Sequence, residues 1–412
     1  MITKPKGCYD LTGRDSKLYK QIVNVVNEYA TVYDYKYVRT PLFESSELFK
    51  RGVGESSDIV QKETYDFTDR SGRGLTLRPE GTAGIVRNYI EDKKYGDLIN
   101  PTKNYYIGTM YRYERPGLGR NREFTQFGVE ALGSDDPLID AEVISMSVNI
   151  LRELGLDVTV KINNLGGLED RENYKNALVD YLKPHINDLC EDCQTRININ
   201  PLRILDCKVD ADSEILKNAP SILDYQSKES EDRFKKVLEY LDYLDIDYEI
   251  DKNLVRGLDY YDYMVYELKL NDSLALGGGG RYNHLVQQLG GPEVPCVGFA
   301  CGVERIINIL KENEDTLDQV DVYIMAVNEE EKLKANIIAQ DLRLNGIIVE
   351  MDYLNRGLKS QFKDADRYNS KQLIILNSED LSKGLVNIKD NLTKDEKKIP
   401  EDEIIDYILG VI

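Results

Sequence analysis

Apolar positions in the first 154 residues alternate between helical and strand spacing. Residues 16–33 repeat apolar side chains every three or four positions, which predicts an amphipathic helix. Strands are predicted at 37–44, 75–78, 104–113 and 123–132, and helices at 81–90 and 137–154. Pro41 removes a ladder donor from the first strand, so we expect that strand at a sheet edge or an interface. The pattern predicts a domain built on a sheet.

The middle of the chain has a different pattern. Residues 168–246 are polar and mostly helical in spacing, and predicted strands lie on either side of them. We interpret this segment as a helical domain inserted into the larger, sheet-based one. Strand and glycine patterns resume at 254–310, where 302–310 predicts a helix, and the charged stretch 311–319 is typical of a linker.

The C-terminal part alternates regularly between strand and helix. Strands are predicted at 320–327, 347–353 and 372–377, and helices at 329–345 and 355–368. This β-α-β-α-β order implies a parallel or mixed sheet with helices packed on it. We therefore predict a separate domain at 320–412, which follows a main domain at 1–315.

Composition narrows the class of protein. The chain has 412 residues, a net charge of −20 and six cysteines, too few for a disulfide framework at this length. No apolar run is long enough to span a membrane, and the start of the chain lacks the apolar core of a signal peptide. We expect a soluble cytoplasmic protein. Its negative charge disfavours indiscriminate nucleic-acid binding but permits binding through local basic patches.

Residues 254–261 hold the most unusual arginine of the chain. Their sequence, LVRGLDYY, predicts a buried strand that carries Arg256, Tyr260 and Tyr261. A buried arginine is costly unless an anion meets it. The glycine run 277–280 supplies a backbone that a ligand can approach closely. Together these segments indicate a pocket for a small, polar, partly anionic ligand.

Residues 112–130 predict two antiparallel strands joined by a basic loop. A Pro-Gly-x-Gly turn is flanked there by four arginines, Arg112, Arg115, Arg120 and Arg122. Arginine pairs bidentately with phosphate oxygens, so the hairpin is suited to clamp phosphates. Gln126 and Glu130 lie four positions apart on the returning strand and therefore face the same side. A surface hairpin held by salt bridges is the alternative.

Two helix starts carry residues that fit ligands of opposite charge. Glu80 and Thr82 follow a predicted strand at the beginning of a helix, where Glu80 would suit a ligand amine. The alternative for Glu80 is a cap of that helix. Arg305 lies in the first turn of the helix predicted at 302–310, where a cation opposes the helix dipole. The position of Arg305 therefore favours contact with an anion such as a triphosphate, and a plain surface arginine is the alternative.

Cysteines and histidines limit the chemistry available to the chain. Cys190, Cys193 and Cys207 with His185 could supply four zinc ligands. Buried or incidental thiols are the alternative that we favour, and we predict no metal site. His185 and His284 are the only histidines, which excludes a histidine-based triad or a paired-histidine metal centre. Neither a Walker A nor a GxGxxG motif occurs in a strand–helix context.

A run of basic residues stands out in the C-terminal domain. Its members recur three, four and four positions apart and are Arg356, Lys359, Lys363 and Arg367. On a helix this spacing makes one basic face in an otherwise acidic chain. Such a face is either solvated or placed to contact the phosphates of a nucleic acid.

These pieces together resemble the histidyl-tRNA synthetases, a family of class II aminoacyl-tRNA synthetases, over nearly the whole chain. Residues 35–44 resemble the class motif of the dimer interface, residues 112–130 the second class motif and residues 298–305 the third. LVRGLDYY and GGGRYN resemble the two histidine-specific motifs. The resemblance implies an α+β fold: an antiparallel-sheet catalytic domain with a helical insertion, followed by a C-terminal α/β anticodon-binding domain.

The resemblance also implies a reaction. A homodimer would activate L-histidine with ATP and Mg²⁺ to histidyl-adenylate and pass the histidine to the 3′ end of tRNA(His). Histidine would bind Glu80, Thr82, Gln126, Glu130, Tyr260 and Tyr261, with Glu130 and Tyr261 receiving the imidazole. ATP would bind Arg112, Arg120, Arg256 and Arg305, with Arg112 and Arg256 as the catalytic pair on the α-phosphate. Contacts to tRNA would come from Arg115, Arg122, Arg356, Lys359, Lys363 and Arg367.

Some positions depart from the family pattern. Asp262 and Tyr263 follow LVRGLDYY where threonine is usual, and Asn283 stands where aspartate is common. The alternative function is that of a non-catalytic, synthetase-like regulatory paralogue of histidine biosynthesis. Such paralogues lack the C-terminal domain and often lose the arginines that this chain keeps.

Overall fold

The computed structural model describes residues 1–412 except 55–56, 58, 118, 208, 272–273 and 314–318. The chain divides into two compact units, Met1–Asn313 and Glu314–Ile412. The larger unit is built on an eight-stranded sheet with the strand order β1-β5-β6-β11-β10-β9-β7-β8. Among the helices of the described residues, none is long and apolar enough to cross a membrane.

Antiparallel pairing dominates the large sheet. Its strands are β1 (Lys36–Tyr37), β5 (Thr102–Tyr111), β6 (Glu123–Leu132), β7 (Thr159–Asn164), β8 (Tyr248–Ile250), β9 (Asp262–Leu270), β10 (Leu274–Arg281) and β11 (Cys296–Gly302). The pairs from β5 through β6, β11, β10 and β9 to β7 are all antiparallel, and the outer pairs β1–β5 and β7–β8 are parallel. The predicted α+β class is confirmed.

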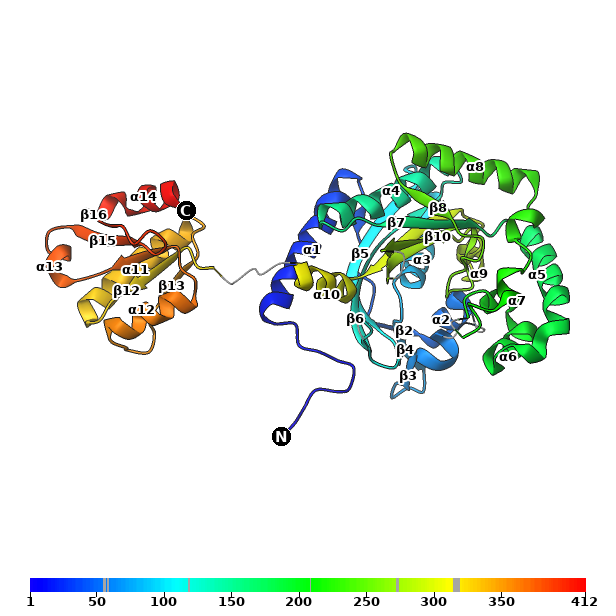
Figure 1. Ribbon diagram of the computed structural model, residues 1–412, viewed down its shortest axis with the longest axis horizontal. Coiled ribbons are helices and arrows are strands. Elements are labelled where there is room, and N and C mark those ends of the chain that lie inside the picture. The colour runs from blue at the N-terminus through cyan, green and yellow to red at the C-terminus, as the bar shows by residue number, and fades with distance from the viewer. Residues whose placement is uncertain (55–56, 58, 118, 208, 272–273, 314–318) are drawn as a thin grey trace. The chain divides into compact units, whose positions relative to one another are not determined.

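Helices cover one face of this sheet, as Figure 1 shows, and they are α1 (Gly13–Val32), α4 (Pro137–Glu153), α8 (Lys228–Tyr243) and α10 (Val303–Asn313). Phe127 and Val129 of β6 point into the hydrophobic core beneath these helices. Side chains alternate along a strand, so Gln126 and Glu130 of β6 face the other side. That other side carries the candidate site.

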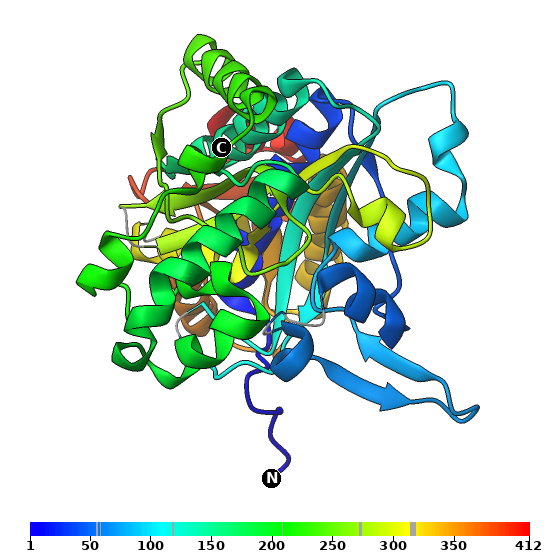
Figure 2. The same ribbon diagram turned by 90° about the vertical axis from the view of Figure 1, so that its right-hand side faces the viewer.

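The opposite face is packed by α3 (Thr82–Glu91) and by helices that follow β7. These helices are α5 (Leu168–Leu182), α6 (Glu191–Ile199) and α7 (Glu214–Lys217), joined by the 3₁₀ turns η3 (Lys183–Asp188), η4 (Pro201–Ile204) and η5 (Ile222–Tyr225). Figure 2 shows these green helices in front of the sheet. The helical pattern predicted for 168–246 is confirmed.

A smaller sheet of three strands, β2 (Phe43–Ser45), β4 (Gly74–Leu77) and β3 (Tyr65–Thr68), lies in the same unit with α2 (Ser46–Val53). The single strand predicted at 37–44 is wrong, because β1 and β2 occupy only its two ends. Pro41 lies in the gap between them, and a proline has no N–H to add to a ladder.

The strand predicted at 254–261 is also wrong. This stretch is an irregular loop that runs into β9 at Asp262. Its carbonyls are paired by side chains instead of by a neighbouring strand: Asn163 donates to the Leu254 carbonyl at 3.0 Å, and Arg203 to that of Arg256 at 3.3 Å. The loop can therefore be buried without ladder bonds.

The C-terminal unit is a mixed sheet with the order β13-β12-β14-β15-β16. Its strands are β12 (Val322–Met325), β13 (Val349–Met351), β14 (Gln372–Ile375), β15 (Leu385–Asp390) and β16 (Glu396–Pro400), and its helices are α11 (Glu329–Leu344), α12 (Leu358–Arg367), α13 (Ser378–Leu381) and α14 (Ile404–Val411). The β-α-β-α-β order is confirmed, and the antiparallel strands β15 and β16 extend it. Of the predicted linker, 311–313 complete α10, and 314–318 lie outside the described residues.

Candidate active site

A buried carboxyl group lies at the centre of the candidate site. Glu130 accepts hydrogen bonds from the Thr82 hydroxyl, at 2.7 Å, and from the Tyr282 hydroxyl. Burial raises its pKa to about 8, although both hydroxyls act to lower it. Gly298 of β11 lies against this carboxyl, and a Cβ there would lie 1.8 Å from Glu130 Oε2. A glycine at this position is therefore what gives Glu130 its room.

Glu80 forms the helix start beside this carboxyl. Its two oxygens accept the backbone N–H groups of Thr82, at 2.7 Å, and Ala83, at 2.8 Å, so Glu80 does cap α3. Burial raises its pKa, while these N–H groups and the charge of Arg112 lower it. A capping oxygen keeps a second lone pair, and Glu80 can accept a ligand amine as well.

Tyrosines wall the site. The ring of Tyr260 lies 4.7 Å from that of Tyr261 and 5.5 Å from that of Tyr282, centroid to centroid. Gln126 lies on the same side of β6 as Glu130, and within the described residues its buried Oε1 has no hydrogen-bond partner. An unpaired buried acceptor is costly, so Gln126 marks a place for a ligand donor.

The predicted arginines converge beside these side chains, since Arg112 acts electrostatically on Glu80 and Arg256 on Tyr261. Arg305 donates from Nε to the carbonyl of Gly119 in the hairpin loop, at 3.4 Å, and from Nη1 to that of Ala275, at 2.6 Å. Burial lowers the pKa of Arg305, and the positive charges of Arg120 and Arg112 lower it further. Three arginines that repel one another indicate a site for a polyanion.

Arg256 belongs to the same cluster of charges. It forms an ion pair with Glu267 at 2.6 Å, and Glu267 also acts electrostatically on Arg305. Its buried Nε has no hydrogen-bond partner among the residues described. Arg112 is fixed by a bond from its Nε to the Pro79 carbonyl at 2.9 Å. The structure thus brings together all four arginines predicted to bind ATP.

Two other hairpin arginines point elsewhere. Arg115 is exposed. The guanidinium of Arg122 lies 3.8 Å above the ring of Tyr113, and its Nε donates to the Glu114 carbonyl at 3.2 Å. Arg122 is thus held on the hairpin itself, next to Glu114, whose carboxylate pairs with Arg120 at 3.8 Å. Both arginines remain candidates for contact with a larger ligand.

The predicted basic helix of the C-terminal unit needs one correction. Lys359, Lys363 and Arg367 are exposed on α12, but Arg356 precedes the helix, which begins at Leu358. Arg356 forms ion pairs with Asp352, at 2.6 Å, and with Asp364. Its charge is therefore partly neutralised, and the basic face on the helix has three members.

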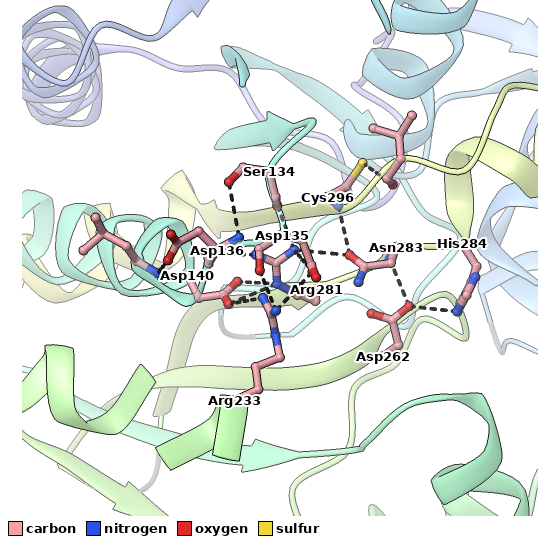
Figure 3. A network of polar contacts seen from close by, with 12 residues as sticks. Ser134, Asp135, Asp136, Asp140, Arg233, Asp262, Arg281, Asn283, His284 and Cys296 are labelled. Atoms are coloured by element: carbon pink, nitrogen blue, oxygen red, sulfur yellow. Dashed lines mark hydrogen bonds and ion pairs between the residues drawn. The ribbon is translucent and has the colours of Figure 1, made fainter. Parts of the chain in front are cut away.

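A second buried polar centre was missed from the sequence, and Figure 3 shows it. Arg281, fully buried after the glycine run, forms an ion pair with Asp140 of α4 at 2.7 Å. Arg233 of α8 reaches the same carboxylate at 3.0 Å. The network fixes the end of β10 against α4, and so holds the next residue, Tyr282, against Glu130. Its only sequence signal was an arginine beside four glycines.

The positions that depart from the family pattern contact one another in this region. The backbone N–H of Asn283 donates to Asp262 at 2.9 Å, and His284 lies 3.8 Å from the same carboxylate (Figure 3). Burial raises the pKa of Asp262 to about 7. Tyr263 has a positive φ of 46° and lies under Arg233, whose guanidinium is 5.6 Å from its ring. These departures therefore lie within the network around Arg281, whose Nη1 donates to Asn283 at 3.3 Å.

An antiparallel sheet that carries an arginine cluster beside a group of buried polar side chains places the chain among the class II aminoacyl-tRNA synthetases. A family model described as histidyl-tRNA synthetase matches residues 7–306, and one described as an anticodon binding domain matches residues 321–410. The chain therefore belongs to the histidyl-tRNA synthetase family, which confirms the resemblance seen in its motifs.

Relatives match along the full chain. A histidine–tRNA ligase of Bacillus cytotoxicus is 48% identical over 99% of this chain and 98% of its own length, and one of Geobacillus sp. is 46% identical over 98% of each. The crystal structure of an apo histidyl-tRNA synthetase from S. aureus superposes with a TM-score of 0.82 at 38% identity, covering 99% of this chain and 100% of that one. This coverage, with the second domain included, does not favour the regulatory paralogue.

Proposed function

We infer that this protein attaches histidine to tRNA(His) in two steps, through a histidyl-adenylate. The observation that carries the inference is that two sites adjoin. One is the buried Glu130 carboxyl, which has hydroxyl donors and no cation partner among the described residues, and the other is the cluster of arginines beside it. The first suits an imidazole and the second a triphosphate. Full-length relatives named histidine–tRNA ligase support the same reaction.

Histidine would lie with its imidazole against Glu130 and Tyr261. An apolar competitor of similar size would leave the buried Glu130 without that partner, which is the kind of loss that gives strong discrimination. The amino group would reach Glu80 and Thr82 at the start of α3, and Gln126 Oε1 would accept one of its N–H groups. Tyr260 would close the pocket by packing on Tyr261.

Activation needs positioned charge and no enzyme nucleophile. A carboxylate oxygen of histidine attacks the α-phosphorus of ATP, a new O–P bond forms, and the bond to the β-phosphate breaks as pyrophosphate leaves. Arg256 and Arg112 would neutralise the charge that develops on the α-phosphate, and Arg305 and Arg120 would hold the phosphates that leave. Glu114 and Glu267, which both act electrostatically on Arg305, are oxygen donors suited to Mg²⁺ that enters with ATP. The ion would supply further charge neutralisation.

Transfer requires the tRNA to reach this site. We propose that Arg115 and Arg122 of the hairpin contact its acceptor end, and that Lys359, Lys363 and Arg367 of α12 contact its phosphates. Arg356 stays in this proposal as a weaker contact, since two carboxylates already share its charge.

Assembly and location complete the proposal. A homodimer would form through residues 35–44 and the small sheet, where Leu42, Phe43 and Phe67 are about half exposed and could be buried by a second copy. The reaction would take place in the cytoplasm.

The test is histidine-dependent exchange of pyrophosphate into ATP by the purified protein with Mg²⁺. Exchange with histidine and with no other amino acid is the expected result. Arg256→Ala should reduce the exchange about 100- to 1,000-fold, the scale of losing one donor to a developing oxyanion. Lys269→Ala is the matched control, because Lys269 pairs with the same Glu267, at 3.6 Å, and should stay near wild type. Folded protein without exchange, or equal loss in both variants, would contradict the proposal.

A further inference from the structure

Three thiols and a carboxylate of the inserted segment converge on one point. The ligand-type atoms of Cys190, Cys193, Cys207 and Asp210 all lie within 4.8 Å of one another. Cys190 and Cys193 belong to the start of α6, whereas Cys207 and Asp210 lie in the turns that follow η4. The pair Cys190–Cys193 and the pair Cys207–Asp210 each have two residues between their members. The fold brings the two pairs together although thirteen residues separate them in the sequence.

The distances fit a tetrahedral cation. Zinc–sulfur bonds of about 2.3 Å and a zinc–oxygen bond of about 2.0 Å in a tetrahedron put two sulfurs about 3.8 Å apart and a sulfur about 3.5 Å from the oxygen. The Sγ atoms of Cys190 and Cys207 are 3.6 Å apart, and Cys207 Sγ is 3.5 Å from Asp210 Oδ2. The backbone N–H of Cys190 also donates to the Asp210 carboxylate, at 3.1 Å to Oδ2 and 3.3 Å to Oδ1, which orients it.

Neither of the simpler explanations accounts for this geometry. A disulfide needs sulfurs about 2.05 Å apart, and all six cysteines are free thiols. Thiols buried only as small apolar groups would not gather around a carboxylate that is itself 8% exposed. His185, the fourth ligand considered from sequence, is not among the four grouped residues, and its ring packs on Tyr181 at 5.8 Å. Asp210 takes the fourth position instead.

We propose that Cys190, Cys193, Cys207 and Asp210 bind a structural Zn²⁺ ion with three sulfur ligands and one oxygen ligand. The four positions offer a closed, four-coordinate site, which is the form of structural rather than catalytic zinc. This reverses our expectation of no metal. Cys193 is fully buried and Cys207 is 4% exposed, whereas Cys190 is partly exposed and gives the ion a path to enter.

The site would brace the segment that supports the catalytic loop. η4 lies in the chain between the two ligand pairs, and Asn200 and Arg203 bond the 254–261 loop: Asn200 donates to Asp259 at 2.8 Å and Arg203 to the Arg256 carbonyl at 3.3 Å. Closing the chain between Cys193 and Cys207 through a metal would limit how far these two residues can move. The ion would therefore act on the reaction through Asn200 and Arg203, and its role is to position the loop.

Metal content of the full-length protein is the first measurement. Protein purified under reducing conditions without added chelator should carry about one zinc ion per chain, as measured by elemental mass spectrometry. Cys193→Ser and Cys207→Ser should each lower the content to less than about half. Cys8→Ser is the matched control, since Cys8 is a free, partly exposed thiol outside the group, and should keep the full content.

Cobalt substitution tests the ligand set and does not require the serine variants to fold. Co²⁺ in the site should give the visible bands of a tetrahedral ion and a sulfur-to-cobalt charge-transfer band whose intensity scales with the number of thiolates. D210C replaces the oxygen ligand by a fourth sulfur and should raise that band by about a third, from three thiolates to four. Asp210→Ala should weaken metal retention without lowering the band of the fully loaded protein.

Clear outcomes would overturn the proposal. Less than about a tenth of an equivalent of any divalent metal, with all six thiols titratable and no tetrahedral cobalt spectrum, would show a cluster of plain thiols. A loss of two titratable thiols would show a disulfide. An unchanged band in D210C would remove Asp210 as a ligand. None of these measurements depends on aminoacylation, so this proposal and the proposed function can fail separately.

Discussion

Two buried carboxyl groups of the catalytic unit are compensated in opposite ways. Asp140 has no exposed surface, and two arginines meet it at 2.7 and 3.0 Å. Glu130 is 1% exposed, yet its partners are the hydroxyls of Thr82 and Tyr282, and no cation is among the groups that shift its pKa within the described residues. The charge of Asp140 is therefore neutralised by residues of the protein itself. Glu130 has only hydroxyl partners, and a buried carboxyl group of that kind indicates a ligand site.

Removal of the compensated carboxylate should have the largest effect on folding. Asp140→Ala takes from Arg281 and Arg233 the buried carboxylate that they share and leaves them only the exposed Asp135. We expect a loss of about 3–5 kcal/mol in the free energy of unfolding. Asp136→Ala is the control at the same helix start. It removes an exposed cap on the Leu138 N–H and should lose only about 1 kcal/mol. Denaturant unfolding measures both losses. Equal losses in Asp140→Ala and Asp136→Ala would mean that the ion pairs of Asp140 do not stabilise the fold.

Removal of the uncompensated carboxyl should affect substrate use instead. Glu130→Ala should lower kcat/KM for histidine by about 100-fold, or roughly 2.7 kcal/mol, because the imidazole loses its partner. The KM for ATP should hardly change. Exchange kinetics with each substrate varied in turn separate the two effects, and an equal rise of both KM values would contradict an imidazole role.

The pH dependence of stability gives a finer test of the same contrast. The pKa of Glu130 is raised to about 8 in the folded chain from 4.5 for an ordinary glutamate. The unfolded chain loses this proton first as pH rises, so Glu130 destabilises the fold progressively between pH 4.5 and 8. The side chain of Glu130→Gln stays neutral. The free energy of unfolding of this variant should therefore rise relative to wild type by up to about 1.4 kcal/mol per pH unit over this window. Thermal unfolding at several pH values measures the difference in stability between the variant and wild type. A difference that does not change with pH would contradict the raised pKa of Glu130.

The smallest expected effect concerns the contact between Asp262 and Asn283. Asp262→Thr removes the carboxylate that accepts the Asn283 N–H, and Asn283→Asp sets a second carboxylate beside the first. The double variant has a single carboxylate again, now at position 283, and should be more stable than the sum of both changes by about 1 kcal/mol. A double-mutant cycle of unfolding free energies measures this coupling. Additive losses would mean that the two positions vary independently.

Local patterns were enough to predict much of the site. The β5–β6 hairpin could be predicted because alternating residues set Gln126 and Glu130 on one face, and because the arginines lie close together in sequence. The family motifs extended this to Arg256 and Arg305. Helices such as α1, α4 and α12, whose backbone hydrogen bonds join residues close in sequence, were placed within a few residues of their observed ends.

What could not be predicted depends on distant partners. The 254–261 loop has the composition of a buried strand, but Asn163 and Arg203 pair its carbonyls from elsewhere in the chain. Asp140 and Arg281 are 141 positions apart, so the sequence gives no sign that they pair. Asp210 looks like an ordinary turn acid until the fold places it beside three sulfurs. Of the two C-terminal antiparallel strands, β16 was missed because it carries few apolar residues, whereas β15 has apolar side chains at Leu385, Val386 and Ile388 that could have indicated it.

Gly298 constrains any attempt to redesign the substrate. Even the smallest side chain at this position would overlap the Glu130 carboxyl, and the carbonyl of Val129 would lie 2.5 Å from the added carbon. A library that varies Gly298 alone would therefore yield mainly misfolded or inactive chains. A shorter residue at 130 would remove only the first of these two clashes, because the Val129 carbonyl belongs to the backbone. An engineer who wants a different amino acid in this site must therefore vary residue 130 and keep glycine at 298.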